Sequence, residues 1–91
     1  PALILQNNIG NRYSPVTIVA AISSWKEEPL YPTEVSLEAF EGGLQSASLV
    51  LLNQIRTIDK RRLIKKVGTL NTKVMERVDR ALQISLGLVE I

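Results

Sequence analysis

The stretch from residue 49 to residue 63, LVLLNQIRTIDKRRL, most constrains what this chain can fold into. It opens with four apolar residues in a row, and a run with no solvated side predicts a strand buried on both faces. Polar residues then alternate with Ile55 and Ile58, and basic residues follow. A core strand that continues into polar and positively charged residues is well suited to presenting a binding site for an anion.

The rest of the chain predicts a small, mainly β domain. Apolar, β-branched or alternating patterns predict further strands over residues 2–6, 16–23 and 34–38. Residues rich in turn formers predict loops over residues 7–15, 24–33 and 40–48. After the central strand, we expect a helical turn at residues 59–63 and a short strand or extended piece at residues 64–70.

The C-terminal part predicts one helix, from about residue 71 to residue 86. Asn71 can cap its first turn, and Gly87 can supply the left-handed stop. Glu76 and Arg80 are four residues apart and are expected to pair on the outer face. The inner face is formed at three-and-four spacing by Val74, Met75, Val78, Ala81, Leu82 and Ser85. We therefore expect a small curled sheet with this helix laid against it.

Composition removes several classes of site. The chain of 91 residues contains neither cysteine nor histidine, which excludes disulfides, thiolate metal sites and the usual general base near neutral pH. Glu27 and Glu28 are adjacent acids in a proline-containing connection, where solvated carboxylates are the expected state. No glycine-rich phosphate loop and no metal-binding spacing are present, so we expect no metal and no cofactor. No apolar run approaches the ~20 residues that span a bilayer, so a cytoplasmic protein without membrane contact is expected.

Positive charge is concentrated in one segment, although the net charge of the whole chain is only +2. We call residues 55–67 the basic run; it holds six basic residues against the single acid Asp59. The rest of the chain carries a net charge of −3. This asymmetry favours a polyanion or an acidic peptide as partner, and a solvated face that keeps the domain soluble is the alternative.

Hydroxyls, amides and arginines are the functional groups that remain. These groups suffice for RNA cleavage, because the RNA 2′-hydroxyl is its own nucleophile and the protein has only to position it and stabilise charge. Arginine can stabilise charge on the phosphate oxygens with its bidentate fork. The residue types therefore permit an endoribonuclease without indicating one.

Five segments resemble the MazF/PemK toxins of bacterial toxin–antitoxin systems: PALILQNNIGN, SPVTIVAAIS, PTEVSL, LLNQIRTIDK and VDRALQISLGL. The resemblance implies a small SH3-like barrel of the MazF/CcdB type with a C-terminal helix, forming a homodimer. It implies a sequence-specific, metal-independent endoribonuclease that cuts single-stranded mRNA, leaves a 2′,3′-cyclic phosphate and is neutralised by a cognate antitoxin. The alternative is a CcdB-like toxin that inhibits gyrase by binding, without nuclease chemistry.

The same resemblance implies two catalytic positions. In the family an arginine and a threonine perform the chemistry. The arginine would directly precede Pro1, and the threonine corresponds to Ser23, which keeps the hydroxyl and lacks only the methyl group. We expect residues 1–91 to form a single toxin domain that lacks an N-terminal piece, because the chain begins without methionine and enters an apolar run at once.

RNA-contacting residues are also implied by the resemblance. Asn7, Gln54 and Arg56 match the family pattern, whereas Asn53 stands where the family usually has an acid. All four are candidates for RNA binding, and the change at Asn53 bears on the preferred RNA sequence. For Arg56, a structural pairing with Asp59 or with the second subunit is the alternative.

Overall fold

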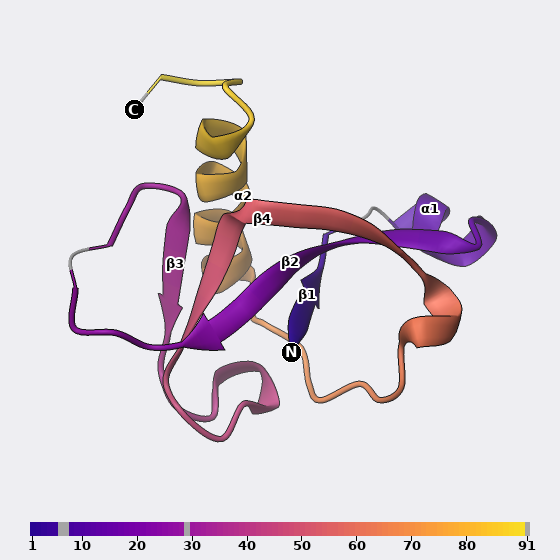
Figure 1. The fold of residues 1–91 in the computed structure, drawn as a ribbon, viewed down its shortest axis with the longest axis horizontal. Coiled ribbons are helices and arrows are strands. Elements are labelled where there is room, and N and C mark those ends of the chain that lie inside the picture. Colours follow the sequence, from indigo (N-terminus) through magenta and orange to yellow (C-terminus); the bar gives the residue numbers. More distant parts are fainter. Residues whose placement is uncertain (6–7, 29, 91) are drawn as a thin grey trace.

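The fold is a four-stranded antiparallel sheet with one long helix packed on it (Figure 1). The computed structural model describes residues 1–5, 8–28 and 30–90. The strands are β1 (Ala2–Ile4), β2 (Val16–Ser24), β3 (Glu34–Leu37) and β4 (Ser48–Asp59), and they lie in the order β1-β2-β4-β3. The helices are α1 (Asn8–Tyr13) and α2 (Thr72–Ser85), with 3-10 turns η1 (Glu41–Gly43) and η2 (Lys60–Arg62).

The pairing of β2 with β4 forms the centre of the sheet, and a bulge divides it into two halves. Val16 to Ala20 pair with Asp59 to Ile55, and Ala21 to Ser24 then pair with Leu51 to Ser48. Ala20 pairs with Ile55, whereas its neighbour Ala21 pairs with Leu51. Residues 52–54 of β4 therefore have no pairing partner on β2. The backbone N–H of Leu52 is instead donated to the carbonyl of Thr33 at 2.9 Å. Such a bulge bends the strand and turns its extra residues away from the ladder.

The core lies between α2 and one face of the sheet. Val74, Val78 and Ala81 are the buried residues of α2. They pack on buried residues of the three longer strands, namely Ala20, Val35, Leu37, Val50 and Leu52. The cap predicted from the sequence is present, since the Asn71 side chain accepts from the N–H of Val74 at 2.9 Å. The predicted stop is also present, because Gly87 has a φ of 73°.

The predicted strands and helix are confirmed, and three local predictions are wrong. Residues 8–13 form the short helix α1 rather than a loop, because tertiary hydrogen bonds from β2 and η2 hold this segment. The strand alternative for residues 64–70 is wrong, since no strand pairs with them within the described part of the chain, and the extended piece is the alternative that stays. The Glu76–Arg80 pair is also absent: within the described residues, the ion pair closer than 4 Å joins Arg61 to Asp59.

No helix in the described ranges is both long and apolar enough to cross a membrane.

The burial of Leu52 predicts a large effect on stability. Leu52 is fully buried in the core beside the bulge, so Leu52→Ala should lower the free energy of unfolding by about 2–5 kcal/mol in denaturant titrations. Ile64 is 97% exposed, and Ile64→Ala should change the same quantity by less than about 0.5 kcal/mol. Equal effects of the two variants would contradict the described packing.

Candidate functional site

Ser23 lies in a hollow at the end of β2, together with Pro1. Ile22 donates its backbone N–H to the carbonyl of Pro1 at 3.1 Å, which holds the start of the chain beside this end of the strand. The hollow has a volume of about 300 Å³ and is lined by Pro1, Ile22, Ser23, Ser24, Leu44, Gln45, Ser46 and Ser48. The structure therefore places Pro1, the residue that would follow the family's arginine, in the same hollow as Ser23.

The opposite wall of this hollow comes from the connection between η1 and β4. The Ser48 hydroxyl donates to the carbonyl of Ser46 at 2.9 Å, and Trp25 donates its N–H to the carbonyl of Ala47 at 3.2 Å. These bonds fix the connection against the end of β2. The sequence predicts only a loop for these residues, although the serine-rich letters QSAS directly before the central strand are a usable signal.

Asn53, Gln54 and Arg56 lie elsewhere on β4. Asn53 and Gln54 are exposed residues of the bulge, and Arg56 is exposed in the second half of the strand. Ser23 pairs with Leu49, seven residues from Arg56, so the two are separated by roughly 20 Å along the strand. One chain therefore does not bring Ser23 and Arg56 together. The fourth RNA-binding candidate, Asn7, lies outside the described residues.

Asp59 is bonded to Arg61 rather than to Arg56. The Arg61 guanidinium donates to the carboxylate at 2.8 Å, and the Arg61 backbone N–H donates to it at 2.9 Å. The side-chain bond, followed by the backbone bond, lowers the pKa of Asp59 below its ordinary value of 3.8. The structural role considered for Arg56 as the partner of Asp59 is therefore wrong in this structure, and its pairing with a second subunit stays a prediction.

Lys60 has a structural role within the basic run. Its ammonium donates to the backbone carbonyls of Gly10 and Asn11, while Thr17, which is buried, donates its hydroxyl to the Asn11 side chain at 2.8 Å. These bonds attach α1 to β2 and to η2, the turn that follows β4, at the right of Figure 1. Lys60 makes these bonds and Arg61 pairs with Asp59. The other four cations of the basic run are exposed, namely Arg56, Arg62, Lys65 and Lys66.

Glycines hold the end of the basic run against η1. A Cβ on Gly68 would lie 2.4 Å from the carbonyl oxygen of Gly42, and a Cβ on Gly43 would lie 2.3 Å from that of Val67. Side chains at these positions would therefore collide with backbone. The exposed segment with Lys65 and Lys66 runs back toward the connection that lines the Ser23 hollow. The close approach of the glycines fixes the path of this segment.

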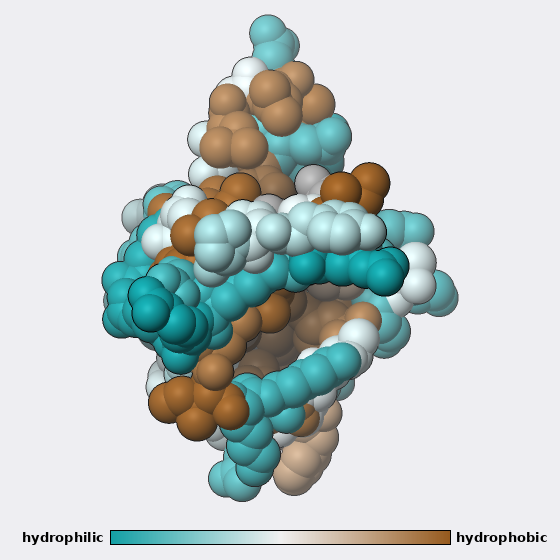
Figure 2. All heavy atoms as spheres, turned by 90° about the vertical axis from the view of Figure 1, so that its right-hand side faces the viewer, coloured by the Kyte–Doolittle hydropathy of each residue, from teal (hydrophilic) through white to brown (hydrophobic). Residues whose placement is uncertain are grey.

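Figure 2 shows the side of the molecule on which α1 and η2 lie. Its middle is hollowed, with hydrophobic atoms in the floor and hydrophilic atoms along the margins. Exposed apolar residues on the basic run include Leu63, Ile64 and Val67. This face thus combines hydrophobic surface with positive charge.

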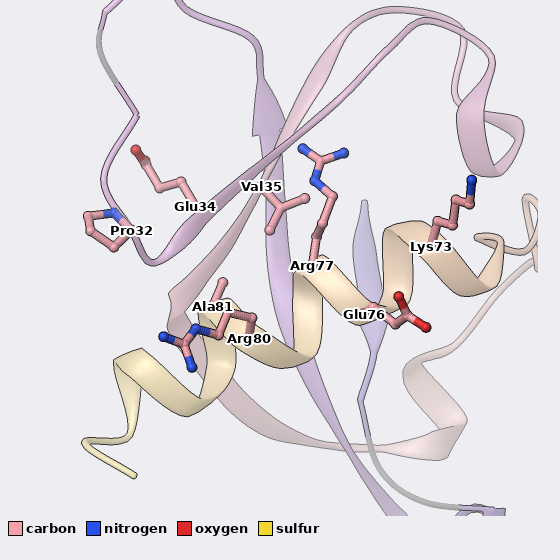
Figure 3. Close-up of a pocket in the computed structure, with 8 residues that line it drawn as sticks. All are labelled: Pro32, Glu34, Val35, Lys73, Glu76, Arg77, Arg80 and Ala81. Carbon is pink, nitrogen blue, oxygen red and sulfur yellow. The ribbon is translucent and has the colours of Figure 1, made fainter. Parts of the chain in front are cut away.

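A second hollow, between α2 and the free edge of β3, contains none of the predicted site residues (Figure 3). Its lining residues are Pro32, Glu34, Val35, Lys73, Glu76, Arg77, Arg80 and Ala81. Arg77 donates to the carbonyl of Ser36 at 3.2 Å and so connects the helix to the edge strand. The mixture of acids and bases and the bond to Ser36 give this hollow a structural role.

The described residues contain no cluster of three or more acidic side chains that could hold a metal ion. The groups near Ser23 are hydroxyls and an amide, and carboxylates are missing from the lining of that hollow. A divalent cation that prefers carboxylate oxygens therefore finds no set of ligands there.

Residues 1–86 match the family of PemK-like, MazF-like toxins of type II toxin–antitoxin systems. The chain belongs to this family. It is 49% identical over 90 residues to endoribonuclease EndoA of Bacillus subtilis strain 168, with 99% of this chain and 78% of that protein covered. The MazF fold of a curled sheet with a C-terminal helix is thereby confirmed.

Solved structures of MazF-like toxins are similar to this chain. A mycobacterial endoribonuclease in complex with its cognate antitoxin superposes with a TM-score of 0.85 at 25% identity, covering 100% of this chain and 84% of that one. A MazE–MazF complex from Deinococcus radiodurans superposes with a TM-score of 0.76 at 27% identity, covering 96% and 80%. These relatives are endoribonucleases or MazF toxins, which favours the first of the two activities inferred from the sequence over gyrase inhibition of the CcdB type.

The glycine contact predicts a matched pair of stability effects. Gly43 and Gly87 both have a positive φ, of 80° and 73°, so alanine at either position should cost about 1–2 kcal/mol from the left-handed backbone alone. Only Gly43 also faces a backbone oxygen, whereas a Cβ on Gly87 meets nothing within 4 Å. Gly43→Ala should therefore lower the free energy of unfolding by at least about 1 kcal/mol more than Gly87→Ala. Equal losses in denaturant titrations would mean that the close approach adds nothing.

Proposed function

We propose that this MazF-like chain is the toxin of a type II toxin–antitoxin system and cleaves single-stranded mRNA in a sequence-specific manner. The observation that carries the proposal is the shared hollow of Pro1 and Ser23 in a chain of this family. The similar proteins named as endoribonucleases support the reaction class. Since mRNA is the substrate, the site of action is the cytoplasm.

The reaction needs little covalent chemistry from the protein. The RNA 2′-hydroxyl loses its proton to solvent as its oxygen attacks the adjacent phosphorus. The bond from phosphorus to the 5′-oxygen breaks and this oxygen takes up a proton from solvent, so that a 2′,3′-cyclic phosphate and a 5′-hydroxyl result. Within the described residues the Ser23 hydroxyl has no hydrogen-bond partner, so it is available to donate to a phosphate oxygen as charge develops there. Charge stabilisation by the arginine that the resemblance puts directly before Pro1 completes the proposed mechanism, and no metal or cofactor takes part.

A second copy of the chain completes the proposed site. Asn53, Gln54 and Arg56 lie too far along β4 to reach an RNA phosphate held at Ser23 of the same chain. In a homodimer, the exposed residues of one bulge can contact the RNA segment that runs on from Ser23 of the other subunit. A cognate antitoxin then inhibits the toxin by occupying the same RNA-binding surface.

Replacing Ser23 tests the proposed chemistry. Ser23→Ala should lower the single-turnover rate of cleavage by about 10²–10³-fold, because one donor to the developing charge is lost. Ser23→Thr should retain activity, since it keeps the hydroxyl. The assay uses the full-length protein as the cell makes it, a labelled single-stranded RNA and excess chelator.

Two controls separate the possible outcomes of this assay. Ser24→Ala removes a neighbouring hydroxyl of the same hollow and should have a much smaller effect than Ser23→Ala. Full activity of Ser23→Ala would assign the chemistry to another residue, with Arg56 the next to be tested. Loss of wild-type cleavage on addition of chelator would contradict the metal-independent reaction.

Charge reversal in the basic run should weaken RNA binding. The double variant Lys65→Glu, Lys66→Glu should reduce the slope of log affinity against log salt concentration by about 1.4, because each contact with a single-stranded phosphate contributes about 0.7. The double variant Lys73→Glu, Arg80→Glu changes the net charge by the same amount on the α2 hollow and is the matched control. Equal slopes for the two variants would mean that the basic run acts only through net charge.

A further inference from the structure

The hollow beside Ser23 has the surface chemistry of a site for a nucleobase. Apolar walls are supplied by Pro1, Ile22 and Leu44, and polar groups come from four serines and Gln45. A base presents apolar faces and a polar edge, and single-stranded RNA is read by enclosing such unstacked bases and bonding to their edges. The volume of about 300 Å³ lies at the lower end of ligand pockets, which suits one nucleotide unit rather than a run of them.

The absence of charged side chains from the lining argues against a phosphate as the occupant. Every side chain that lines this hollow is neutral, whereas recognition of a phosphate uses arginine, lysine or several backbone N–H groups. The exposed cations of the basic run lie on a different segment of the chain. In the proposed reaction the Ser23 hydroxyl binds the scissile phosphate, so the phosphate lies at the Ser23 side of the hollow and the rest of the lining suits an uncharged group.

Gln45 is the side chain of this hollow that can distinguish one base from another. Its amide carries two donor hydrogens and an acceptor oxygen, so it can bond in a bidentate manner to the edge of a base. In the described part of the chain this amide makes no hydrogen bond to protein. The backbone on which it stands is fixed on its C-terminal side by the Ser48–Ser46 and Trp25–Ala47 bonds, which reduces the entropy lost on binding.

We propose that this hollow receives the unstacked base next to the scissile phosphate and that Gln45 reads the edge of this base. The inference rests on the proposed function, since it requires RNA to be cut at Ser23. It assigns part of the sequence preference to the connection between η1 and β4. Asn53 and Gln54 on the bulge then read other positions of the RNA.

The test compares Gln45→Ala with wild type and with Gln83→Ala. Gln83 is an exposed glutamine of α2 that lines neither hollow, so it is a matched control. Cleavage sites of the full-length wild-type protein are first mapped by sequencing fragment ends. Single-turnover rates are then measured on a panel of RNAs that carry every single-base change around the mapped cut.

Gln45→Ala should reduce discrimination between bases at one position next to the cut by about 3- to 10-fold, the worth of one neutral hydrogen bond. Discrimination at the other positions should be unchanged, and Gln83→Ala should match wild type throughout. Gln45→Glu replaces the amide donors with acceptors and should shift the preference at that same position toward bases that present an amino group. If both Gln45 variants melt at the same temperature as the wild-type protein, their folding is intact.

Three results would overturn the inference. Unchanged base preferences in both Gln45 variants, with Ser23→Ala still impaired, would exclude Gln45 as a reader and leave the proposed function standing. A rate loss that is equal for all RNAs would give Gln45 a role in catalysis or loop structure instead of base recognition. If the full-length wild-type protein cuts no RNA of the panel or of a total transcript pool, the proposed function itself fails, and the inference fails with it.

Discussion

The pairing of β2 with β4 is the interaction on which the rest of the structure depends. Both strands are central, and each of the outer strands pairs with one of them. The core under α2 is built mainly from side chains of these two strands and of β3, so any shift of register would expose apolar residues and bury polar ones. The same register sets Ser23 opposite Leu49 and carries Arg56 to the far half of the sheet. Core packing and the layout of the candidate site thus have a single cause.

The bulge at residues 52–54 reconciles two demands on β4. Its first half must be apolar to complete the core, while its second half must be polar and accessible. An interruption in the ladder allows Leu52 to stay buried while Asn53 and Gln54, its immediate neighbours, are exposed. On one chain the bulge residues and Arg56 lie far from Ser23, which is why the proposed function needs a second copy of the chain.

Much of this could be predicted from sequence because the signals are local. Apolar runs predicted the strands, Asn71 and Gly87 predicted the limits of α2, and the five family-like segments predicted the fold. The catalytic role that these segments imply for Ser23 stays a prediction. The helix at residues 8–13 was missed because it depends on Lys60 and Thr17, which are distant in sequence or belong to the next strand. The position of the connection around Gln45 was missed for a similar reason, since only the fold brings it beside Pro1 and Ser23. Of the two states expected at residues 64–70, the strand was wrong because a strand also requires a pairing partner, and the extended piece remains.

The backbone contact of Gly43 and Gly68 has a consequence for how tightly RNA can be held. A long exposed segment that carries lysines would ordinarily sample many conformations, and ordering it on a ligand would consume binding free energy. Here the segment is anchored at one end by η2 and at the other by glycine-to-backbone packing, so much of that ordering is complete before any RNA arrives. In the proposed complex with RNA, Gly43 and Gly68 would thereby reduce the conformational entropy lost when Lys65 and Lys66 bind phosphate. This preorganisation is possible because Gly43 and Gly68 lack a Cβ atom.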